Sequence, residues 1–80
     1  MTKEELMVLL AEMATDALYC IEILAIPKSR ENLKIALKEH FDFNKDWTAQ
    51  RLYNSIVDLE KYGSWQDLND VNRALLAMKE

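Results

Sequence analysis

The sequence is poor in the residues that interrupt or cross-link a chain, because its 80 residues include only one glycine, one proline and one cysteine. A single cysteine excludes an intrachain disulfide, and a single glycine excludes the glycine-rich loops that hold phosphate groups. Turn residues are also too scarce for a series of β-hairpins. With a hydrophobic content of 50%, these shortages favour a folded helical chain over a sheet protein or a disordered tail.

The sequence has fewer basic than acidic residues, with 10 of the former and 14 of the latter, and its formal net charge is −4. Direct nucleic-acid binding is therefore not expected, because it usually requires a basic surface. The N-terminal apolar segment is interrupted by Glu12, Asp16 and Glu22, which would be costly inside a bilayer, and the N-terminus does not predict a signal peptide. We expect no membrane association. The lone cysteine suits a reducing compartment, so we expect a cytoplasmic protein.

Apolar residues recur at intervals of three and four residues, which predicts one all-α domain over residues 1–80. The first helix is predicted over residues 1–26. Thr2 and Glu5 have the spacing of a capping box at its start, and the following Pro27 ends it.

Three further helices are predicted from their capping residues. Ser29, Thr48 and Ser64 are the expected N-caps, and Gly63 stands where a helix ends in a left-handed conformation. With short connections between them, the elements predict a compact four-helix bundle.

The predicted N-terminal helix is apolar on nearly every side, whereas a helix packed on one small core needs only one apolar stripe. The rest of the chain, a second copy or a partner must therefore cover it, and we expect it to be the central element of the bundle. Its predicted core face comprises Leu6, Leu9, Leu10, Met13, Ala17, Ile21 and Leu24, whereas Val8, Tyr19, Ile23 and Ile26 lie largely outside that face.

The loop after the second predicted helix partly matches a calcium-binding motif. Asp42, Asn44 and Asp46 occupy the first three ligand positions of an EF-hand loop. The required glycine is replaced by Trp47 and the bidentate glutamate by Tyr53. The pattern therefore favours an ordinary polar loop, and no metal site is predicted.

No arrangement of residues predicts catalysis. His40 is the only histidine, and Cys20 lies within an apolar segment, where a buried hydrophobic role is favoured over a nucleophilic one. Catalytic groups usually stand on loops around a pocket, and this sequence predicts little loop. We expect neither an enzyme nor a bound cofactor.

Two tryptophans and a row of acidic residues along the first predicted helix are the candidates for contacting a partner. The tryptophans stand at predicted helix starts, where they could anchor an interface or simply cover the core edge. The acidic line along the first helix could border a docking face or simply be a solvated edge. The candidate partner-binding residues are Glu5, Glu12, Asp16, Tyr19, Trp47 and Trp65.

These observations predict a small protein that acts by binding another protein, as an inhibitor, immunity factor, adaptor or regulator. One alternative is a homodimer in which the first helix packs on its twin, with a structural or regulatory role. The other is an acidic mimic of nucleic acid that blocks a nucleic-acid-binding protein. The mixed charge of the chain makes the mimic the weakest of the three.

Overall fold

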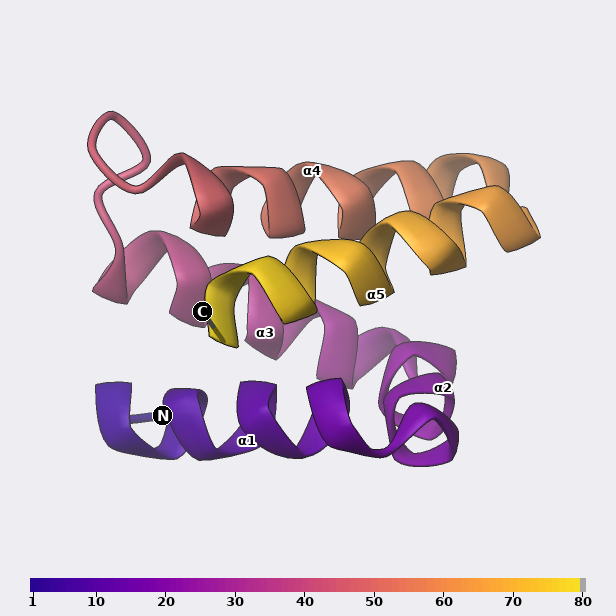
Figure 1. Ribbon diagram of the computed structural model, residues 1–80, viewed down its shortest axis with the longest axis horizontal. Helices are drawn as coiled ribbons and strands as arrows, with labels where there is room; N and C mark the ends of the chain where they lie inside the picture. The colour runs from indigo at the N-terminus through magenta and orange to yellow at the C-terminus, as the bar shows by residue number, and fades with distance from the viewer. Residues whose placement is uncertain (80) are drawn as a thin grey trace.

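The computed structural model describes residues 1–79, and these residues form five helices and no strand (Figure 1). The predicted all-α class is confirmed. The helices are α1 (Lys3–Thr15), α2 (Ala17–Ala25), α3 (Pro27–His40), α4 (Trp47–Tyr62) and α5 (Trp65–Lys79).

The prediction of one continuous helix over residues 1–26 is wrong, because the chain breaks at Asp16. This residue has extended backbone angles, with φ −127° and ψ 98°. Its carboxylate accepts hydrogen bonds from the backbone N–H groups of Leu18 and Tyr19, both at 3.1 Å. Aspartate is a strong N-cap and a poor interior helix residue, so it starts a second helix here. As a result, α2 runs at a steep angle to α1 (Figure 1).

Helices α3 and α4 begin at other residues than predicted, because a residue near each predicted N-cap sets the start instead. Pro27 is the first residue of α3, where its missing N–H costs nothing, so Ser29 is not the N-cap. The cap of α4 is Asp46 rather than Thr48, because its carboxylate accepts from the backbone of Ala49 and from the Thr48 hydroxyl.

The corner between α4 and α5 follows the prediction. Gly63 adopts a left-handed conformation with φ 62°, in which a residue with a side chain would be strained. Ser64 and Asp67 then cap α5 reciprocally, since each side chain accepts from the backbone N–H of the other residue. Their side chains also share a 2.7 Å hydrogen bond. The two helices consequently form an antiparallel hairpin (Figure 1).

All five helices contribute to one core. Helix α1 packs against α2, α3 and α5, while α3 also contacts α4. The predicted burial of Cys20 is confirmed, and this burial raises the pKa of its thiol above the ordinary 9.0. The buried apolar residues are Leu6, Leu10, Met13, Cys20, Leu24, Leu33, Ala36, Leu37, Ala49, Leu52, Ile56, Val71, Ala74 and Leu75.

The N-terminal segment is not enclosed by the rest of the chain, contrary to the predicted central position. In Figure 1, α1 lies along one edge of the molecule. Ile21 was predicted to be in the core, yet it is 41% exposed, and Ala17 is also exposed. A second set of large apolar side chains from this segment faces solvent: Met7, Val8, Leu18 and Ile26.

An ion-pair cluster joins α3 to α4. The Glu60 carboxylate accepts from Lys34 and, at 3.2 Å, from Arg30. Arg30 also donates to the carbonyl of Leu24 at 2.6 Å, near the C-terminal end of α2. The hydrogen bond from Lys34 is the main cause that lowers the pKa of Glu60 below the ordinary 4.5.

This lowered pKa predicts an acid-sensitive contribution to stability. A carboxyl group whose pKa falls on folding stabilises the protein above its unfolded pKa, and that contribution is lost as the pH falls through the folded pKa. We expect the free-energy difference between wild type and Glu60→Gln, on the order of 0.5 to 1 kcal/mol at neutral pH, to shrink as the pH falls through the lowered pKa of Glu60. Urea unfolding of both proteins across this range measures it. A difference that stays constant with pH would mean that the cluster contributes no charge-dependent stability.

Candidate protein-interaction surface

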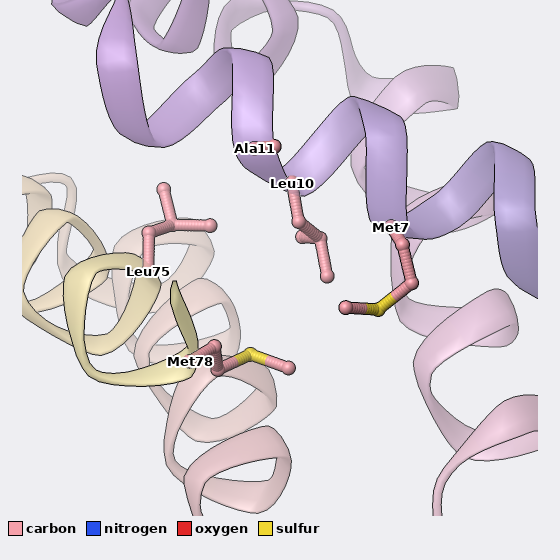
Figure 2. Close-up of a pocket in the computed structure, with 5 residues that line it drawn as sticks. All are labelled: Met7, Leu10, Ala11, Leu75 and Met78. Atoms are coloured by element: carbon pink, nitrogen blue, oxygen red, sulfur yellow. The ribbon is translucent and has the colours of Figure 1, made fainter. Parts of the chain in front are cut away.

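Two recesses open between α5 and the N-terminal helices. The first, of about 50 Å³, is lined by Met7, Leu10 and Ala11 of α1 and by Leu75 and Met78 of α5. Figure 2 shows Met7, Leu10, Leu75 and Met78 directing their side chains into the space between the two helices. The second is lined by Ala17, Cys20 and Ile21 of α2 and by Trp65, Leu68, Asn69 and Asn72 of α5.

The two recesses lie along the same helix, α5. The first turns of α5 line the recess beside α2, and its last turns line the recess beside α1. Helix α5 therefore runs antiparallel to the N-terminal segment. We define the α5 seam as the residues that line either recess, together with two exposed leucines that follow lining residues in the sequence. These are Leu18, after Ala17, and Leu76, after Leu75.

The α5 seam follows from the residue pattern of its helices. Trp65, Asn69, Asn72 and Leu76 recur at intervals of four, three and four residues, which places them on one stripe of α5. The core-facing stripe of the same helix carries the buried residues Val71, Ala74 and Leu75. On the opposite wall, Ala11 and Ala17 are too small to fill the space beside α5, and this leaves the recesses open.

The α5 seam is uncharged and mostly apolar, with Asn69 and Asn72 as its polar side chains. Trp65 is 78% exposed, Leu18 67% and Leu76 49%. Of the side chains that line the two recesses, only the Cys20 thiol is titratable, and burial raises its pKa so that it stays protonated at neutral pH. Exposed apolar side chains that gather along one helix are a feature of interaction sites on soluble proteins.

A second surface on α1 carries negative charge. We call it the acidic groove, and it is lined by Glu4, Glu5, Val8, Leu9, Glu12 and Tyr19. It brings together three of the predicted partner-binding residues, namely Glu5, Glu12 and Tyr19. Glu5 also has a structural task, because its carboxylate accepts from the Thr2 backbone N–H at 3.0 Å. The hydrogen bonds to Thr2 lower the pKa of Glu5, so this carboxylate remains ionised.

The other three predicted residues are dispersed. Trp65 lies in the α5 seam. Trp47 is 71% exposed and borders a separate recess on α4 with Gln50 and Asn54. The Asp16 carboxylate is occupied in capping α2. The predicted set therefore does not form one surface, and its role in partner binding stays a prediction.

Sequence reasoning missed most of the α5 seam. It assigned Ile21 to the core because an unbroken helix would turn that residue to the same side as Leu10. The signal that was available is the stripe on α5 from Trp65 to Leu76, which places large apolar side chains outside the core-facing positions.

The loop between α3 and α4 uses its acidic side chains for local hydrogen bonds. Asp42 accepts from the backbone of Asn44 at 3.0 Å, and Asp46 caps α4. Within residues 1–79, no group of three or more histidine, cysteine, aspartate or glutamate side chains is placed to hold a metal ion. In the same part of the chain, every helix is too short or too polar to cross a bilayer.

Comparison with known proteins found no matching family model, no matching curated protein and no matching solved structure.

Proposed function

We propose that this protein is a small non-catalytic protein-binding module and that the α5 seam is the surface that contacts its partner. The observation that carries the proposal is the exposed apolar surface shared by α1, α2 and α5. Trp65 stands at one end of this surface, and exposed tryptophans are frequent anchors of protein interfaces. An inhibitor, immunity factor, adaptor or regulator would act in this way.

The chemistry of the α5 seam supports binding over catalysis. General acid–base catalysis needs titratable groups placed within reach of a substrate. The only such group lining the recesses is the Cys20 thiol, which is 3% exposed and has a raised pKa, so it is a poor nucleophile. The proposal includes a cytoplasmic location, since a lone reduced cysteine suits a reducing compartment.

The two tryptophans provide a matched test of this function. Both are the first residue of a helix and both are more than 70% exposed, but only Trp65 lies in the α5 seam. We expect wild type and Trp47→Ala to capture the same partner from a lysate of the native host, with recovery reduced about tenfold or more for Trp65→Ala. Quantitative mass spectrometry of the captured proteins measures the ratio.

A further variant separates the acidic-mimic alternative from the α5 seam. Glu12→Lys reverses a charge in the acidic groove without touching the seam. If this variant loses the partner while Trp65→Ala retains it, the acidic groove is the binding surface and the α5 seam is not. Binding by the acidic groove would also weaken steeply with salt, because it would depend on charge.

A further inference from the structure

We infer that the chain bound by the α5 seam is a second copy of this protein, in a two-fold symmetric dimer; this inference rests on the proposed protein-binding role of that surface. The argument uses the charge, the shape and the hydrogen-bonding groups of the seam. In a two-fold interface the same surface patch faces itself, so the patch must be self-complementary in all three respects.

Charge makes the seam suitable for contact between identical chains. Each copy carries a formal net charge of −4, so two copies repel, and an uncharged contact surface adds no further repulsion at short range. A dimer through the acidic groove would place Glu4, Glu5 and Glu12 opposite the same residues of the partner. The residues that line the two recesses of the α5 seam are all uncharged.

The shape of the α5 seam also suits contact between identical chains. Trp65 projects from one end of the α5 seam, and the recess beside Met7 and Met78 lies at the other end. A two-fold axis that lies in the interface, perpendicular to the seam, places each Trp65 against the partner's recess. Methionine side chains are flexible and make favourable sulfur contacts with aromatic rings, so this recess can adapt to the indole.

The middle of the seam is also self-complementary. Asn72 lies halfway along α5 between Trp65 and Met78, so the proposed axis passes close to it. A carboxamide carries both hydrogen-bond donors and acceptors, and it can therefore pair with the same group of the second copy. A carboxylate at this position would instead meet an identical charge.

The first measurement is sedimentation equilibrium of the full chain from about 1 to 100 µM. We expect the wild type to have about twice the chain mass of 9.4 kDa at the upper end. Trp65→Ala should raise the dimer dissociation constant about tenfold or more, while the matched Trp47→Ala should leave it within about twofold. Salt should have little effect or favour the dimer slightly, since the contact is uncharged and salt screens the repulsion between the copies.

The second measurement tests the position of the axis. Asn72→Asp preserves the shape of the side chain and should raise the dissociation constant about tenfold or more at neutral pH, with recovery at pH values where the carboxyl group is protonated. Asn54→Asp, on the exposed face of α4, is the charge-matched control and should have little effect.

Either of two results would overturn the inference. A wild type that remains monomeric at 100 µM would exclude the dimer, and a dimer unaffected by both Trp65→Ala and Asn72→Asp would have to use another surface. Neither result decides the proposed function, which fails only if Trp65→Ala captures partners as well as wild type does.

Discussion

Replacing Leu37 by alanine is expected to lower the free energy of unfolding by about 2 to 5 kcal/mol. Leu37 is fully buried on α3, in a core to which all five helices contribute. Truncation removes apolar contacts and leaves a cavity, because the surrounding helices can close only part of the space. Domains of this size have little stability to spare, so the loss is a large fraction of the total. Urea denaturation followed by tryptophan fluorescence or circular dichroism measures the change.

Ile35 provides the control on the same helix. It lies two residues before Leu37 and is 54% exposed. Alanine at this position should change the free energy of unfolding by no more than about 0.5 kcal/mol, as is usual for surface substitutions. Equal losses at the two positions would show that the orientation of α3 toward the core is wrong.

Replacing Asp16 by alanine is expected to cost about 0.5 to 2 kcal/mol of folding free energy. The aspartate satisfies two backbone N–H groups in the first turn of α2, and alanine cannot accept either hydrogen bond. Alanine also favours a continuous helix, which would swing α2 away from the position in which Cys20 and Leu24 are buried. The same denaturation experiment measures the loss.

Asparagine at position 16 separates capping from charge. Its side-chain oxygen can accept the same two hydrogen bonds, so Asp16→Asn should retain most of the stability. If alanine and asparagine are both neutral, the break between α1 and α2 is imposed by tertiary packing and the cap is incidental.

The break at Asp16 also explains why the first segment exposes so much apolar surface. A straight helix over residues 1–26 would have kept one continuous stripe toward the core. In the folded chain, α1 buries Leu6, Leu10 and Met13, while α2 turns and buries Cys20 and Leu24. The change of direction leaves Leu18 and Ile21 at the surface, and Ile21 lines the recess beside α5. The part of the α5 seam beside α2 therefore depends on the change of direction at Asp16.

Helix class, the corner at Gly63 and the capping box at Thr2 could all be predicted from the sequence. Each depends on residues that lie within four positions of one another, so the spacing of residues in the sequence is enough to predict it. The excess of apolar side chains in the first segment was visible for the same reason. The pairing of α3 with α4 through Glu60 was not, because Arg30 and Lys34 are distant from it in the chain.

The order of residues is enough to predict that this protein is helical, acidic and more apolar along its first segment than a single small core requires. Which of those apolar side chains remain exposed depends on how the helices pack, including the angle between α1 and α2, so the folded structure is needed to find them. It also decided that α5 forms the second wall of the exposed surface. Trp65 and Ile21 are more than forty residues apart in sequence, and only the folding of the chain brings them to one recess.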